Sequence, residues 1–200
     1  MLMSNEPAAA RKPFLSLLQV VFLGSIITAD FAFGLVAKNL LAPTPILNFV
    51  RIDMIVPVML MLLTRRILDR FGVLILYEFV WGTFSVFAMP AAFGLPGMLK
   101  IVPAVAQGIF LDGLMSLFRR MESVQLYVTA IVGGVLSSVV LYALKVALGT
   151  PWSVVVQLLL GIHMVSNVVV WISAAWIAQI VWRRIRSLPI VRRLCLVSPD

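Results

Sequence analysis

Uncharged apolar runs of about 20 residues recur along the chain, separated by short segments that contain proline, glycine or charged residues. A helix rises about 1.5 Å per residue, so a run of about 20 residues spans the roughly 30 Å hydrocarbon core of a bilayer. Six segments meet this description: residues 14–37, 46–64, 71–89, 97–118, 124–148 and 152–182. The sequence therefore predicts an all-α fold, an integral membrane bundle of six transmembrane helices.

Composition excludes the two main alternatives to such a bundle. Hydrophobic residues make up 62% of the chain and charged residues 12%, with a mean hydropathy of +1.09. A water-soluble helical domain needs charged faces on its helices, and these residues are too few to supply them. A transmembrane barrel would show apolar and polar residues alternating over segments of about 10 residues, and the chain does not alternate in that way.

The basic residues predict how the bundle is oriented. Lys and Arg residues on the side of the two termini and of the second and fourth connections are Arg11, Lys12, Arg65, Arg66, Arg70, Arg119, Arg120, Arg183, Arg184, Arg186, Arg192 and Arg193. The other side has Lys38, Arg51, Lys100 and Lys145. Because cytoplasmic connections are enriched in basic residues, both termini are predicted to be cytoplasmic. We expect a multi-pass protein of the cell (inner) membrane, with tails at 1–13 and 186–200 and a membrane domain at 14–185.

Few residues are available for catalytic or metal chemistry. Cys195 is the single cysteine and His163 the single histidine, so the chain has no intramolecular disulfide and no thiol cluster for a metal. It contains no phosphate-binding Gly-Lys-Ser/Thr loop, no HExxH motif and no GxSxG motif. The net charge of +8 lies in clusters beside the apolar runs. We therefore expect no enzymatic activity, no cofactor, no metal site and no binding of nucleic acid.

Polar residues gather in the outer half of the predicted bundle. They are Arg51, Asp53, Lys100, Gln107, Lys145, Trp152, Gln157, His163 and Asn167. His163 and Asn167 are four residues apart and therefore face the same way on a helix. Ionisable groups inside a membrane are costly and frequently mark solute pathways. The alternative is that His163 only joins helices and that Arg51, Asp53 and Lys145 reach to the interface.

Three further carboxylates lie within predicted spans. Asp30 is placed in the outer quarter of the first span, whereas Glu78 and Asp112 lie at matching depth, nearer the cytoplasm, on consecutive antiparallel helices. Glu78 and Asp112 could share a proton or a cation. Equally, one of them could be protonated, or both could bond to neighbouring hydroxyl and backbone groups.

Small residues form two stripes with a spacing of four. Gly24, Thr28 and Ala32 follow one face of the first span, and the fifth span has a similar series. Such stripes let helix backbones approach closely. They predict helix packing, either within the bundle or against another membrane subunit.

Two stretches resemble the substrate-binding S components of energy-coupling factor (ECF) vitamin transporters. The first is NFVRIDMIVPVMLMLLTRRILDRFG, which follows a partly apolar first connection; the second is GLPGMLKIVPAVAQGIFLDGL, with a Gly/Pro start, a basic residue and a Gly-plus-acid end. Size, six spans and cytoplasmic termini are also similar over about residues 14–185.

The resemblance implies a subunit that captures a vitamin or related micronutrient at its outer side. Its implied partners are the bilayer, a transmembrane coupling subunit and two cytoplasmic ATPases, which would supply the missing nucleotide site. The implied substrate-binding residues are Asn48, Arg51, Asp53, Lys100, Gln107, Trp152, Gln157, His163 and Asn167. Family members dock through alanines spaced by four on the first helix, where this chain has Gly24, Thr28 and Ala32. The alternative function is a non-transporting assembly or lipid-handling membrane protein whose polar residues are structural.

Overall fold

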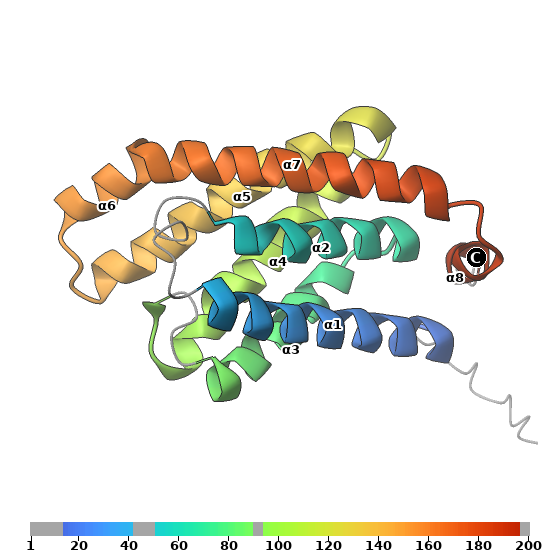
Figure 1. The fold of residues 1–200 in the computed structure, drawn as a ribbon, viewed down its shortest axis with the longest axis horizontal. Coiled ribbons are helices and arrows are strands. Elements are labelled where there is room, and N and C mark those ends of the chain that lie inside the picture. Colours follow the sequence, from blue (N-terminus) through green and yellow to red (C-terminus); the bar gives the residue numbers. More distant parts are fainter. Residues whose placement is uncertain (1–13, 42–50, 90–93, 197–200) are drawn as a thin grey trace, which may run out of the picture.

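The computed structural model describes residues 14–41, 51–89 and 94–196, and within these ranges the chain is all-helical with no strand. Figure 1 shows the helices as a bundle of roughly aligned rods. The elements are α1 (Leu17–Leu41), η2 (Ile52–Met54), α2 (Ile55–Leu68), α3 (Val73–Ala88), η4 (Gly97–Lys100), α4 (Ile101–Leu117), α5 (Glu122–Ala147), α6 (Trp152–Leu160), α7 (Ile162–Ile185) and α8 (Pro189–Leu196).

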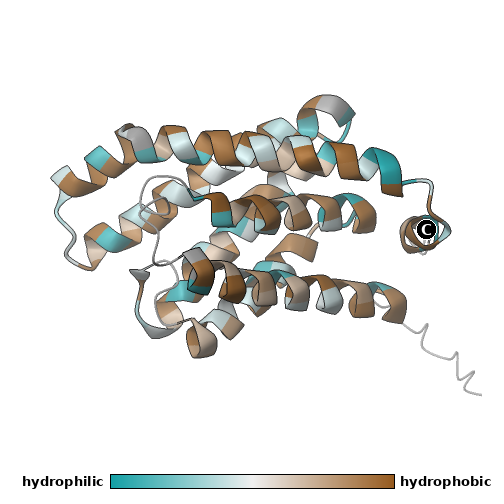
Figure 2. Cartoon of the chain, in the orientation of Figure 1, coloured by the Kyte–Doolittle hydropathy of each residue, from teal (hydrophilic) through white to brown (hydrophobic). Residues whose placement is uncertain are grey.

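Four helical segments are long and apolar enough to cross a membrane. They are Leu17–Ala37, Gly97–Leu117, Val124–Ala147 and His163–Ile185. Large apolar side chains such as Val21, Phe87 and Leu117 remain exposed on the surface, as expected where lipid is the solvent. Figure 2 shows apolar stretches along α1 and α7 and a hydrophilic end of α7 beside α8. These features indicate a multi-pass membrane protein.

The other two predicted spans are shorter helices. The segment predicted at 46–64 includes η2 and most of the 14-residue α2, and the segment predicted at 71–89 contains the 16-residue α3. The first of these predictions ended too early, because α2 continues through Arg65 and Arg66 to Leu68.

The last predicted span, at 152–182, is interrupted in the structure. Gly161 adopts an extended conformation, with φ −87° and ψ −173°, and separates α6 from α7. A Cβ atom at this position would lie 2.1 Å from the carbonyl oxygen of Gln157. Only glycine fits this backbone without a shift, so the prediction of one continuous helix is wrong.

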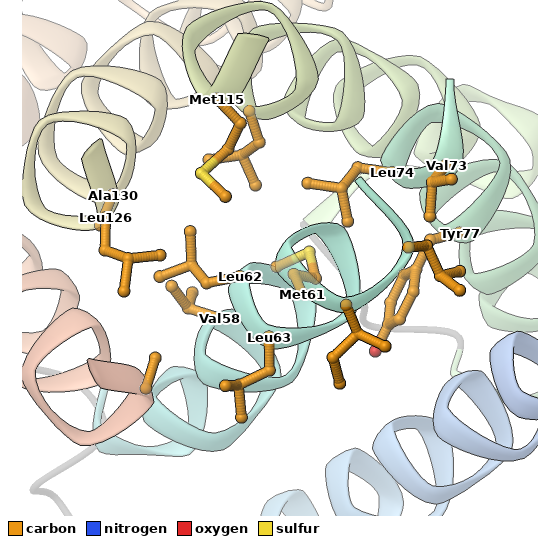
Figure 3. Packing of buried hydrophobic residues seen from close by; sticks show 14 of the residues in the cluster. Val58, Met61, Leu62, Leu63, Val73, Leu74, Tyr77, Met115, Leu126 and Ala130 are labelled. Atoms are coloured by element: carbon orange, nitrogen blue, oxygen red, sulfur yellow. The ribbon is translucent and has the colours of Figure 1, made fainter. Parts of the chain in front are cut away.

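The short helix α2 occupies the centre of the bundle. It packs against α1, α3, α7 and α8, and Figure 3 shows its side chains Val58, Met61 and Leu62 surrounded by apolar residues of neighbouring helices. Those neighbours include Leu74 of α3 and Met115 of α4. Because the other helices surround α2, its apolar side chains form part of the buried protein core.

The helices α3 and α4 approach each other unusually closely. A Cβ atom at Gly108 of α4 would lie 2.5 Å from the carbonyl oxygen of Leu74 and 2.9 Å from the Cα of Ile75, both on α3. The absence of a side chain at Gly108 therefore sets the distance between these two helices.

The C-terminal helix α8 lies at one end of the bundle. Val191 and Leu194 are buried, and Gln19 near the start of α1 donates from Nε2 to the carbonyl oxygen of Leu194 at 3.0 Å. Cys195 Sγ donates to the carbonyl oxygen of Ile67 at 3.3 Å. The start of α1, the end of α2 and the end of α7 thus meet at one end of the bundle, on the right in Figure 1.

Candidate functional site

Two adjoining cavities lie in the half of the bundle away from α8. The first, of about 50 Å³, lies between α1, α2, α3 and α4; the second, of about 100 Å³, lies between η2, α4, α5 and α7. Arg51, Met54 and Gln107 line both. Each cavity has room for several water-sized groups. Because they share these three residues, we treat the two cavities together as the candidate site.

An ion pair stands between the two cavities. Arg51, just before η2, donates from Nε and Nη2 to the two carboxylate oxygens of Asp53 at 2.9 and 3.0 Å. Asp53 is buried, whereas the Arg51 side chain is 45% exposed. Such a bidentate pair fixes the guanidinium in one orientation, with one face available to a ligand.

Gln107 is the polar residue of α4 that reaches both cavities. Its Nε2 lies 3.8 Å from Met61 Sδ, a weak acceptor. Among the described residues no donor bonds to its amide oxygen. The amide is therefore placed to exchange hydrogen bonds with a bound molecule.

The second cavity has polar walls from α5 and α7. Ser137, Ser138 and Tyr142 come from α5, and Asn167 and Trp171 come from α7. A Cβ atom at Gly134 would lie 2.4 Å from ring atoms of Trp171, so the glycine lets the indole lie against α5. Hydroxyl, amide and indole groups in one cavity suit a small polar aromatic molecule.

The first cavity is lined by carboxylates from two helices. Asp30 of α1 and Glu78 of α3 are 2% and 5% exposed and both line it. Tyr77 donates its hydroxyl to Asp30 Oδ2 at 2.9 Å. Trp81 of α3 and Gly34 of α1 complete this wall.

Glu78 and Asp112 do not form the pair that their depth suggested. Asp112 Oδ1 accepts from Arg65 Nε at 2.6 Å, and its Oδ2 accepts from the backbone N–H groups of Gly72, Leu74 and Ile75 at 3.0, 2.8 and 3.1 Å. Asp112 therefore caps the N-terminus of α3. The hypothesis of a shared proton or cation at Glu78 and Asp112 is wrong; the structural alternative holds for Asp112.

Of the residues implied as substrate-binding by the resemblance, four line the cavities: Arg51, Asp53, Gln107 and Asn167. Lys100 lies elsewhere, because its buried ammonium donates to the carbonyl oxygens of Ser85 and Met89 at 3.4 and 2.9 Å and so caps the C-terminus of α3.

The other described residues of this set are not among those that line the two cavities. Trp152 is 64% exposed and Gln157 is also exposed, both on α6. His163 is half-buried near the start of α7 and is not among the residues lining either cavity. Asn48 lies outside the described residues.

The predicted docking stripe faces outward. Gly24, Thr28 and Ala32 are all exposed on α1, and a Cβ atom at Gly24 would meet nothing within 4 Å. The stripe is therefore not used for packing inside the described bundle. The similar stripe on α5 is turned inward, with Ala130 and Gly134 buried.

Several cavity residues were missed as site residues by the sequence analysis. Glu78 was assigned to the inner half, and Tyr142, Ser137, Ser138 and Trp171 were not considered as site residues. One signal was present: Trp171 lies four residues after Asn167 and therefore faces the same way.

No protein-family model, curated protein or solved structure matches this chain.

Proposed function

We propose that this chain is the substrate-capture subunit of an ECF-type importer, which binds a vitamin or related small micronutrient at its outer side. The observation that carries the proposal is the pair of adjoining cavities around Arg51 and Gln107. They combine apolar and aromatic walls with a few convergent polar groups, which is the usual character of a small-molecule site.

The position of the cavities agrees with capture from outside. Their residues lie late in α1 and α5 and early in α2, α4 and α7. Basic residues gather at the opposite end, where Arg66, Arg119 and Arg183 border surface hollows. In the proposed topology this basic end and both termini are cytoplasmic.

The proposed topology has six spans in the inner cell membrane. The short helices α2 and α3 are the two additional spans. A helix surrounded by protein does not have to match the full hydrocarbon thickness, because its ends contact other helices rather than lipid. The central position of α2 supports this arrangement.

The proposed partners are a transmembrane coupling subunit and two cytoplasmic ATPases. The outward-facing stripe of Gly24, Thr28 and Ala32 supports the first, since small exposed residues let a second membrane helix approach α1 closely. Energy for transport would come from the ATPases. The proposed role of this chain is binding, without catalysis.

The test is thermal unfolding of the purified protein in detergent with a panel of vitamins. We expect one class of compound to raise Tm, and we expect Gln107→Leu and Asn167→Leu to remove that increase. Gln157→Leu is the matched control, because Gln157 is exposed on α6. If no compound raises Tm, or if Gln107→Leu and Asn167→Leu only lower stability, the proposal fails in favour of a non-transporting membrane protein.

A further inference from the structure

We propose that the first cavity binds a positively charged nitrogen of the substrate, with Glu78 and Asp30 as the counter-charges. This inference rests on the proposed function, and it narrows the substrate to the class of small organic cations. Vitamins and related micronutrients include anionic, neutral and cationic compounds, so this inference excludes two of the three kinds of substrate.

The acidic residues of the chain divide into two groups. Six of them lie in the described segments, and four of these form ion pairs: Asp53, Asp69, Asp112 and Glu122. The other two are Asp30 and Glu78, and both line the first cavity. Among the described residues, the other four carboxylates each have a cationic partner, whereas Asp30 and Glu78 have none.

Both unpaired carboxylates are more than nine-tenths buried. No described residue forms a hydrogen bond or an ion pair with Glu78, which is 5% exposed. Asp30 is 2% exposed and uses only one carboxylate oxygen: Oδ2 accepts from Tyr77, while Oδ1 is buried without a hydrogen bond. Buried carboxylate without a partner is costly in a membrane protein, and a cationic ligand would remove that cost.

The carboxylates are held in place from both helices. In Figure 3 the ring of Tyr77 projects from α3 toward α1, and its hydroxyl fixes the orientation of Asp30. Glu78 follows Tyr77 directly on α3. The two carboxyl groups therefore reach the cavity from different helices, so that both could contact one bound cation.

The basic residue that lines the first cavity already has a carboxylate partner. Arg51 lines the first cavity, but its Nε and Nη2 are bonded to Asp53. Arg51 with Asp53 forms a neutral pair, so the residues that line this cavity leave Asp30 and Glu78 without a counter-charge. A cationic ligand would supply one.

An aromatic face completes the cation site. Trp81 lies one helical turn after Glu78 and lines the same cavity, and it is in edge contact with Phe31, at 6.2 Å between ring centroids and 73° between planes. Indole is the best aromatic partner for a cation. Met54 and Met61 supply apolar walls, which suit an organic cation.

A metal ion fits the cavity less well than an organic cation. The described residues contain no group of three or more His, Cys, Asp or Glu side chains placed to hold a metal. Hard metal ions take six or more oxygen ligands, or keep several waters. An ammonium or aromatic nitrogen cation requires only the two carboxylates and the aromatic face.

The experiment extends the thermal panel with matched probes. Thiamine, pyridoxamine and choline are the cations; riboflavin, biotin and 3,3-dimethylbutan-1-ol, the uncharged analogue of choline, are the controls. We expect a cation, and none of the controls, to raise Tm of the wild-type protein. We expect Glu78→Gln and Asp30→Asn each to increase Kd for that cation at least about tenfold, because each removes one charge-assisted contact.

Glu122→Gln is the control variant, because Glu122 is an exposed carboxylate at the opposite end of the bundle; its Kd should not change. The inference is overturned if biotin or riboflavin raises Tm and Glu78→Gln leaves that increase intact, a result that would leave the proposed function standing. It is also overturned if a cation binds equally well to wild type and to both variants. If no compound raises Tm, the proposed function itself fails.

Discussion

Arg65 of α2 and Asp112 of α4 form a buried ion pair, with Nε 2.6 Å from Oδ1 and with side chains that are 4% and 0% exposed. Arg65 also donates to Ser116 Oγ at 2.9 Å, and Asp112 accepts from three backbone N–H groups at the start of α3. This pair therefore joins the central helix to α3 and α4, which both line the first cavity. It is a structural element at the end of the bundle opposite the candidate site.

The first prediction concerns this pair. Arg65→Met should destabilise the protein by about 3–5 kcal/mol, because it leaves the charge of Asp112 buried without its partner. The double variant R65M/D112N should recover part of that loss, since no charge is then buried. Thermal or denaturant unfolding in detergent micelles measures both. Arg120→Met is the control, because Arg120 is exposed; an equal loss in the control would contradict the prediction.

The second prediction concerns the contact between α3 and α4. Gly108→Ala should destabilise by about 1–3 kcal/mol, because the new Cβ would meet backbone atoms of Leu74 and Ile75 at 2.5 and 2.9 Å. Gly113→Ala on the same helix should be neutral or stabilising, since its Cβ meets nothing within 4 Å and alanine favours the helix. Unfolding midpoints of the two variants should therefore shift in different directions. Equal midpoints would mean that α3 and α4 are farther apart than described.

The third prediction separates a helix cap from a ligand contact. Lys100→Met should lower stability by about 1–3 kcal/mol, because the carbonyl oxygens of Ser85 and Met89 lose their donor. It should leave the Kd of any bound compound unchanged. Gln107→Leu should do the reverse, raising Kd with little effect on unfolding, since its amide bonds weakly within the protein. Measuring Tm and Kd for both variants tests the assignment, which is refuted if Lys100→Met abolishes binding while stability is unchanged.

The sequence predicted the helices better than it predicted the site, for a physical reason. The length of an apolar run is a local property, so the helices α1, α4 and α5 lie close to their predicted positions. The prediction of one helix over 152–182 was wrong because a glycine within an apolar run is compatible with a helix. The extended backbone that breaks the helix at Gly161 is visible only in the structure.

Which residues line a site depends on how each helix is rotated about its axis relative to its neighbours. A single sequence does not give that rotation directly. The resemblance placed Lys100 and Gln107, both in the predicted span 97–118, in one pocket. In the structure Lys100 turns to the end of α3, whereas Gln107 turns to the cavities. Asp30 and Glu78 lie in one cavity only because α1 packs beside α3, a contact between segments almost fifty residues apart.

The last prediction tests the proposed orientation with the single cysteine of the chain. Cys195 lies on α8 at the basic end and is exposed, so no other thiol competes for a reagent. If this end is cytoplasmic, a membrane-impermeant maleimide should label the protein in inside-out vesicles and not in right-side-out ones. Cys195→Ser should abolish the labelling. Labelling from the outside alone would reverse the topology and place the cavities on the cytoplasmic side.

The pH dependence of that labelling is a second readout from the same residue. Partial burial of the Cys195 thiol beside Ile67, and secondarily the charge of Asp69, raise its pKa above its ordinary value. Since the thiolate is the reacting form, the labelling rate should keep rising at a pH where a free thiol such as glutathione is already levelling off. Denaturing the protein in detergent should bring the profile back to that of the free thiol. A native profile identical to that of glutathione would mean that α8 does not pack against α2 as described.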